Sequence, residues 1–158
     1  MGSHTATVTW QRKANEAFID NKYSRGHLWE FDGGAQVQAS ASPHIVRFPY
    51  SIAANVDPEE AYIAALSSCH MLFFLSLTAS AGFVVDDYAD HAVGRMAKNE
   101  AGRTVVTEIV LSPVVRYKGS SPSREKEEHL HHEAHEACFL ANSVKTKITV
   151  QLSETALA

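Results

Sequence analysis

An α+β fold with mainly antiparallel sheets is predicted for this chain of 158 residues. Segments of alternating apolar and polar residues lie on both sides of one long apolar run, and a charged helical segment follows later. The expected order is strands, helix, strands, helix and strand, which differs from the strict alternation of a parallel α/β fold. With 45% hydrophobic residues, the chain is long enough for one core without disulfide bonds. We therefore expect a single domain over residues 1–158, with residues 1–4 either native, disordered or left by cloning.

The N-terminal third predicts a small sheet and a loop. Residues 5–10 alternate and indicate a strand. Residues 28–31 indicate a second strand, and a Gly-Gly turn leads to a hairpin partner over residues 36–41. Residues 42–56 contain two prolines and little periodicity, so we expect a loop that shapes a pocket.

The first helix has a clear predicted start. Asp57 can cap it, Pro58 suits the first helical position, and Glu60 completes a capping-box pattern. The helix should run to about Ala79 and stop near Gly82.

An apolar run with no charged residue extends from Ala61 to Val85, which is long enough to span a bilayer. Its flanks are acidic and lack the Lys/Arg excess that orients a membrane span. Serines and His70 also dilute the run. We expect a central helix enclosed by sheets or by a partner subunit, and no membrane.

The second half predicts a hairpin, a helix and a closing strand. Residues 88–98 and 103–117 indicate the hairpin, in which Pro113 marks an edge or a bulge. Residues 123–139 indicate a helix with a strongly charged face. Residues 144–152 alternate and indicate the final strand.

Charge and compartment exclude some functions. The net charge is −4, and no more than two basic residues are adjacent, which argues against nucleic acid as a partner. The N-terminus has no apolar stretch of a secretory signal. Two cysteines without such a signal fit the reducing cytoplasm, where a disulfide is transient and catalytic.

The only two cysteines lie in contrasting surroundings. Cys69 is inside the apolar run, where its pKa should rise unless a cation is brought to it. Cys138 lies in the polar segment HLHHEAHEACFLANS, where we expect it to be accessible. A sulfenic acid on Cys69 could then condense with Cys138 to a disulfide. The alternative is that both are ordinary packed cysteines.

Arg25 is the best candidate for the activating cation, because it lies in a loop between Tyr23 and Trp29. A guanidinium stays charged in apolar surroundings and can hold a thiolate and a peroxide oxygen together. An exposed loop arginine is the alternative interpretation, and Arg12 and Arg47 are competitors.

Glu59 could orient that arginine, although a carboxylate in a first helical turn is favourable whatever it contacts. On one straight helix Glu59 and Cys69 lie roughly 15 Å apart. They can share a site only through an intervening arginine, a break in the helix or a partner subunit.

Two non-catalytic alternatives remain open. A zinc site is one, because three side chains of the kinds that bind zinc lie at i, i+4 and i+7 on one helical face, although HHEAHE is not the HExxH pattern. A module that binds an apolar ligand at a dimer interface is the other. The zinc ligands would be His131, His135 and Cys138, and the pocket would be lined by Met71, Phe73 and Phe74.

Three segments resemble one known family. DPEEAYIAALSSCHMLFFLSL is similar to the central-helix motif of the osmotically inducible protein C and organic hydroperoxide resistance (OsmC/Ohr) family. The resemblance extends to YSRGHLWEFDGG before it and to HHEAHEACFLANSVKTKITV after it, so it covers nearly the whole chain.

The resemblance implies an OsmC-like fold, with sheets wrapped around a long helix in an intertwined homodimer, and a thiol peroxidase used in oxidative or osmotic stress. Cys69 matches the peroxidatic cysteine, Cys138 the resolving cysteine, Arg25 the catalytic arginine and Glu59 the glutamate that holds it. The implied substrate is a small-molecule organic hydroperoxide or hydrogen peroxide, and the implied reductant is a dithiol such as a lipoyl group on a protein. No cofactor or metal is implied. Phe139 departs from the family pattern, since many members have proline after the second cysteine.

Overall fold

The structure is a computed structural model that describes residues 2–152. The chain forms two compact units, Met1–Ala61 and Tyr62–Ala158, and the boundary lies in the first turn of the long helix. The expectation of a single domain stays a prediction. Two helices and mainly antiparallel sheets confirm the predicted α+β class.

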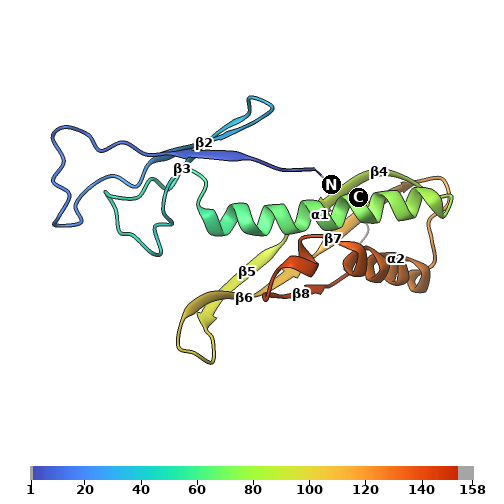
Figure 1. The fold of residues 1–158 in the computed structure, drawn as a ribbon. Helices are drawn as coiled ribbons and strands as arrows, with labels where there is room; N and C mark the ends of the chain where they lie inside the picture. The colour runs from blue at the N-terminus through green and yellow to red at the C-terminus, as the bar shows by residue number, and fades with distance from the viewer. Residues whose placement is uncertain (1, 153–158) are drawn as a thin grey trace. The chain divides into compact units, whose positions relative to one another are not determined.

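The first unit contains a three-stranded antiparallel sheet (Figure 1). Its strands are β1 (Ala6–Thr9), β2 (His27–Phe31) and β3 (Gln36–Ala39), with β2 in the middle. The predicted hairpin is confirmed. Gly34 has a φ of 84° at its turn, a conformation that glycine adopts without a steric penalty.

Helix α1 (Pro58–Ser80) begins as predicted. The Glu60 N–H donates to Asp57 Oδ1 at 2.8 Å, and the Asp57 N–H donates to Glu60 Oε2 at 3.1 Å. These reciprocal bonds form a capping box, which satisfies two backbone donors at the helix start. The helix ends before Gly82, whose φ of 86° is the left-handed conformation of a helix terminator.

The second unit holds two sheets. Strand β4 (Val84–Asp90) pairs antiparallel with β7 (Pro113–Lys118). The other sheet contains β5 (Val93–Lys98), β6 (Thr104–Leu111) and β8 (Lys147–Val150), with β6 in the middle. Strand β8 runs parallel to β6, and the sequence did not indicate this pairing.

The predicted hairpin over residues 88–117 is therefore only partly right, because it divides between the two sheets. Asp90 accepts a hydrogen bond from the Ser112 N–H through Oδ1 at 2.6 Å, and another from the Ser67 hydroxyl through Oδ2. The Asp90 carboxylate therefore satisfies the Ser112 N–H at the point where the chain leaves one sheet and enters the other.

Helix α2 (Arg124–Ala137) is capped by Ser123, whose hydroxyl accepts from the Lys126 N–H at 3.2 Å. It ends two residues before the predicted Phe139, and Cys138 is its extended C-cap. The short 3-10 helix η1 (Ala141–Ser143) follows.

Two core clusters hold α1 in the second unit. One joins Leu66 of α1 to Ile109 and Leu111 of β6. At this end α1 also approaches β5 closely, because a Cβ on Gly94 would lie 2.5 Å from Ile63 Cδ1.

The other cluster joins Phe74 of α1 to Leu130 and Ala134 of α2. The buried residues of α1 recur at every fourth position, so one row faces the core. These buried residues are Leu66, His70, Phe74 and Thr78.

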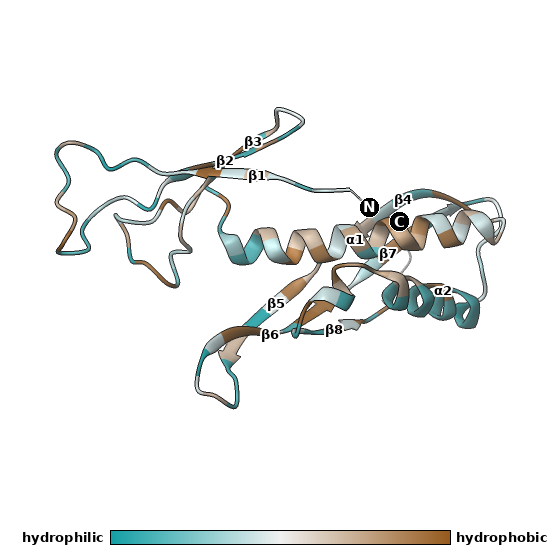
Figure 2. Cartoon of the chain, viewed as in Figure 1, coloured by the Kyte–Doolittle hydropathy of each residue, from teal (hydrophilic) through white to brown (hydrophobic). Residues whose placement is uncertain are grey.

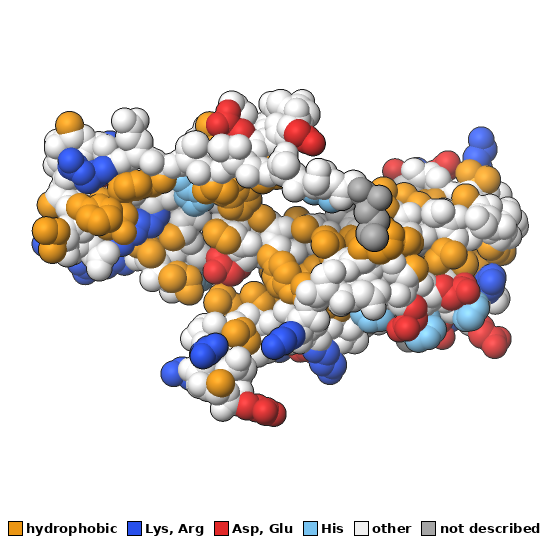
Figure 3. Space-filling model, in the orientation of Figure 1, with side chains coloured by type: hydrophobic (Ala, Val, Ile, Leu, Met, Phe, Trp, Pro, Cys, Tyr) orange, Lys and Arg blue, Asp and Glu red, His pale blue; other side chains and the backbone are white. Residues whose placement is uncertain are grey.

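Hydropathy differs between the two helices. Helix α2 is mostly hydrophilic and α1 is mixed to apolar (Figure 2). By length and composition α1 is able to cross a membrane. Figure 3 shows apolar side chains at the surface. Leu72 of α1 is 61% exposed.

Candidate active site

The structure brings the two cysteines together in the second unit. Cys69 is half-buried on α1, and Cys138 is only 1% exposed at the end of α2. Burial raises the pKa of the Cys138 thiol above its ordinary value, and the neighbouring Cys69 thiol raises it further. Both thiols are free, and Cys69 is near enough to Cys138 to raise the pKa of its thiol.

The turn after α2 holds Cys138 in place. The Ala141 N–H donates to Cys138 Sγ at 3.5 Å, and the Asn142 N–H donates to the Cys138 carbonyl at 3.1 Å. Phe139 packs edge-on against Phe73 of α1, with ring centroids 5.0 Å apart. The expectation of an accessible Cys138 is therefore wrong, because η1 folds back over the end of the helix.

Arg25 lies in the loop before β2, and its guanidinium binds that loop. Nη1 donates to the Asn21 carbonyl at 2.9 Å and to the Tyr23 carbonyl, and Nη2 donates to Asn21 Oδ1 at 3.4 Å. The guanidinium carbon also lies 3.7 Å from the centroid of the Tyr23 ring. The partners of the Arg25 guanidinium named here are thus two carbonyls, an amide oxygen and an aromatic ring, and neither a thiolate nor a carboxylate is among them.

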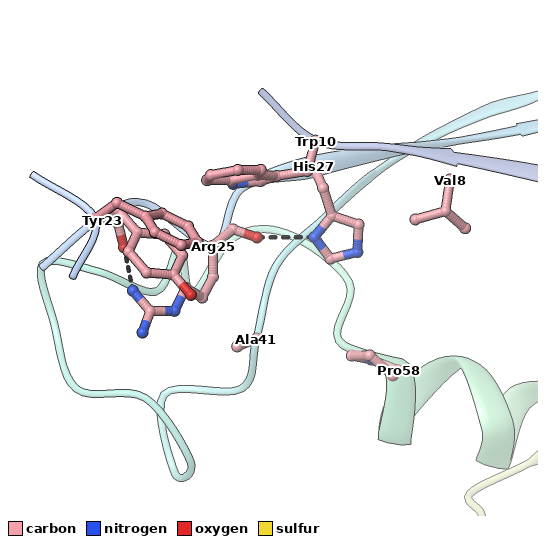
Figure 4. Close-up of a pocket in the computed structure, with 8 residues that line it drawn as sticks. Val8, Trp10, Tyr23, Arg25, His27, Ala41 and Pro58 are labelled. Carbon is pink, nitrogen blue, oxygen red and sulfur yellow. Dashed lines mark hydrogen bonds between the residues drawn. The ribbon is translucent and has the colours of Figure 1, made fainter. Parts of the chain in front are cut away.

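A cavity of about 490 Å³ opens beside Arg25 in the first unit (Figure 4). Its walls are mainly apolar, with one guanidinium and one imidazole among them. His27 Nδ1 lies 2.8 Å from the Arg25 carbonyl, and because a carbonyl only accepts, Nδ1 is the donor in this bond. The cavity is lined by Val8, Trp10, Phe18, Tyr23, Arg25, His27, Ala41 and Pro58.

The apolar pocket expected around Met71, Phe73 and Phe74 is not the cavity found. Phe74 is fully buried in the core with Leu130, and Phe73 contacts Phe139. The periodicity of α1 does not indicate which of its faces packs inside its own chain.

Glu59 is half-buried in the first turn of α1. Within residues 2–152, neither a hydrogen bond nor an ion pair joins Glu59 to Arg25. The competitor Arg12 donates to the carbonyls of Lys13 and Glu16. The roles assigned to Arg25 and Glu59 stay predictions.

The zinc alternative at His131, His135 and Cys138 is wrong. In the described part of the chain, no three histidine, cysteine, aspartate or glutamate side chains are grouped as a metal ion would need. The proposed i, i+4, i+7 face requires a helix through Cys138, and α2 ends at Ala137.

His131 instead pairs with His70. Nε2 of His70 lies 3.0 Å from Nδ1 of His131, and the rings are stacked. This pair was not predicted from the sequence. The available signal was a histidine inside an otherwise apolar helix.

A family model for OsmC-like proteins matches residues 53–153. The chain belongs to the OsmC-like protein family. A comparison with curated protein sequences found no match.

Solved structures give the same assignment. An OsmC-like protein of unknown function from Vibrio cholerae O1 biovar eltor is 55% identical, with a TM-score of 0.94 over 97% of this chain and 100% of that one. An organic hydroperoxide resistance protein from Elizabethkingia anophelis, with thiocyanate bound, is 18% identical, with a TM-score of 0.70 over 96% of this chain and 94% of that one. An OsmC-like protein from Mycoplasma pneumoniae is 14% identical, with a TM-score of 0.70 over 96% of each chain. The OsmC/Ohr family and fold predicted from the sequence are confirmed.

Proposed function

We propose that this OsmC-like protein is a thiol peroxidase that reduces organic hydroperoxides, and also hydrogen peroxide, through Cys69 and Cys138. The observation that carries the proposal is the closeness of the two thiols, since Cys69 is near enough to raise the pKa of the Cys138 thiol. A half-buried thiol next to a buried one suits a reaction in which the first is oxidised and the second resolves it.

The proposed cycle balances in three steps. The Cys69 thiolate attacks the O–O bond, and with one proton this gives Cys69 sulfenic acid and an alcohol. The Cys138 thiol then attacks the sulfenic sulfur, which forms the disulfide and releases water. An external dithiol, such as a lipoyl group on a protein, reduces the disulfide and is itself oxidised.

Arg25 is proposed to hold the Cys69 thiolate and the peroxide, and Glu59 to orient Arg25. In this proposal Arg25 exchanges its bonds to Asn21 and Tyr23 for bonds to the reacting atoms. A guanidinium suits this role because it stays charged and presents several donors.

The apolar cavity beside Arg25 supports an organic substrate. Aromatic side chains of Trp10, Phe18 and Tyr23 form part of its wall and suit an alkyl or aryl group. We propose that hydroperoxides with such groups are preferred over hydrogen peroxide.

A homodimer in the cytoplasm is the proposed working form. Large apolar side chains are exposed in both units, including Phe48 at 81% and Leu72 at 61%. Apolar surface of this kind marks an interaction site in a soluble protein. Sedimentation of the purified chain should therefore give twice the monomer mass.

Turnover of cumene hydroperoxide with a dithiol donor tests the function. The natural chain should consume the peroxide, Cys69→Ser should abolish consumption, and Cys138→Ser should allow one turnover without forming the disulfide. Full turnover by Cys69→Ser would refute the proposal.

The same cavity favours a second candidate, a binding protein for an apolar ligand. Under this alternative, mass spectrometry of the native purified protein should reveal a retained lipid-like molecule, and Cys69 should not react with peroxide. Reaction of Cys69 without any retained ligand would exclude it.

A further inference from the structure

His70 and His131 form a buried pair between the helices that carry the two cysteines. His70 directly follows Cys69 on α1, and His131 lies two helical turns before Cys138 on α2. Their Nε2 and Nδ1 atoms are 3.0 Å apart, and the rings are 6° from parallel. The two residues are only 1% and 2% exposed.

Burying this pair in the core costs free energy, because polar ring atoms lose their contact with water. Phe74 stacks on the His131 ring at 3.9 Å, so the surroundings are apolar. His70 Nδ1 and His131 Nε2 are both buried without a hydrogen-bond partner. Apolar residues of similar volume would avoid this desolvation penalty, so stability alone does not account for the pair.

A buried hydrogen bond gives directional control that apolar packing lacks. In the same cluster Leu130 and Ala134 of α2 pack with Phe74 of α1 and with partly buried apolar residues of α1, β4 and β7. Apolar contacts of this kind tolerate small shifts. An N–H···N bond weakens steeply when its distance or angle changes. The histidine pair therefore selects one placement of α2 against α1.

That placement decides where Cys138 lies. Cys138 is the C-cap of α2, so it moves with the helix. A disulfide forms without backbone movement only when the two Cα atoms lie within about 7 Å. Rotation of α2 by one residue, about 100°, would carry Cys138 away from Cys69.

We propose that His70 and His131 are positioning residues for disulfide closure, because their hydrogen bond fixes α2 so that the Cys138 thiol meets Cys69. This inference rests on the proposed peroxidase function. The closure step, in which a sulfenic acid and a thiol give a disulfide and water, needs no proton from either histidine. Both rings stay uncharged at neutral pH, since burial lowers the pKa of His70 to about 4 and of His131 to about 3.

Three variants of the full chain separate the hydrogen bond from the packing. His131→Phe keeps a ring on Phe74 but loses the bond. His131→Asn loses the ring but keeps a polar atom close to the position of Nδ1. His132→Phe changes the exposed neighbouring residue and is the matched control.

The reduced proteins are treated with excess cumene hydroperoxide, and mass spectrometry measures the ratio of Cys69–Cys138 disulfide to Cys69 sulfinic acid. We expect His131→Phe to lower this ratio by about tenfold, the effect of losing one buried hydrogen bond. His131→Asn should restore most of the ratio, and His132→Phe should leave it unchanged. An unchanged ratio in His131→Phe, or no recovery in His131→Asn, would overturn the proposal.

A second measurement needs no peroxide, so it separates this inference from the proposed function. In glutathione redox buffers, the equilibrium between the dithiol and the disulfide reports the effective concentration of the two thiols. His131→Phe should lower that concentration about tenfold, even if Cys69 proves unreactive with peroxides. His70→Leu should lower the effective concentration in the same way. If circular dichroism shows that His131→Phe is unfolded, His70→Leu takes its place in the comparison. Equal equilibria for the natural chain and the variant would refute the positioning role.

Discussion

Acid should destabilise this protein through the buried pair of His70 and His131. The folded chain keeps both rings neutral, because burial lowers the pKa of His70 to about 4 and of His131 to about 3. In the unfolded chain each histidine has the ordinary value of about 6.5. Below pH 6.5 the unfolded state therefore binds more protons than the folded state, so the free energy of unfolding falls with pH until the folded values are reached.

The magnitude follows from these values. Between pH 7.5 and pH 5.0 each unfolded histidine becomes mostly protonated while its folded counterpart stays mostly neutral. The loss is about 2 kcal/mol per histidine and about 4 kcal/mol for the pair. A loss of this size is a large part of the stability of a typical domain.

Urea unfolding followed by far-ultraviolet circular dichroism at the two pH values measures the loss. The double variant His70→Leu/His131→Phe is the comparison, because the other titrating groups are common to both proteins. We expect the variant to lose about 4 kcal/mol less than the natural chain. An equal loss in the two proteins would refute the reasoning.

An NMR titration of the imidazole protons checks the cause without any folding experiment. Signals assigned to His70 and His131 should stay at their neutral positions from pH 7.5 to pH 5.0. A midpoint near 6.5 for either ring would show that burial does not keep it neutral.

Three further outcomes are expected. Gly94→Val should destabilise the fold by about 1–3 kcal/mol, measured by urea unfolding, because its side chain would collide with Ile63 of α1; full stability would contradict the close approach of α1 and β5. Asp57→Ala should cost about 1 kcal/mol of stability through loss of the capping box, and an unchanged midpoint would show that the cap is not needed. Arg25→Lys should lower kcat/KM for cumene hydroperoxide by tenfold or more, because lysine lacks the planar set of donors of a guanidinium. Arg47→Lys is the matched control and should leave kcat/KM unchanged. A larger loss of kcat/KM in Arg47→Lys than in Arg25→Lys would assign the activating cation to Arg47.

Local features of this fold were predictable from the sequence. The start of α1 depends on two residues only three positions apart. The spacing of Asp57 and Glu60 therefore predicts the capping box that the structure contains. The hairpin of β2 and β3 was predictable for the same reason, since a Gly-Gly turn separates two short alternating segments. The pairing of β8 with β6 was not, because residues far apart in sequence decide it.

The candidate site shows the same difference between features set by nearby residues and features set by residues far apart in the sequence. Chemistry singled out Cys69 and Cys138, but their approach depends on how α2 packs on α1. The burial of Cys138 was missed because the turn that covers it follows the helix and carries no periodic signal. The hydrogen bond between His70 and His131 joins positions 61 residues apart. The local sequence around either histidine therefore does not indicate which residue it contacts.

The arrangement of β8 beside β6 has a consequence for biosynthesis. Strand β6 leaves the ribosome with β5 already available to pair, but one of its edges stays open until residues 147–150 emerge. At roughly 5–20 residues per second, that interval lasts for seconds. During it the nascent chain presents an unpaired strand edge of the kind that chaperones shield.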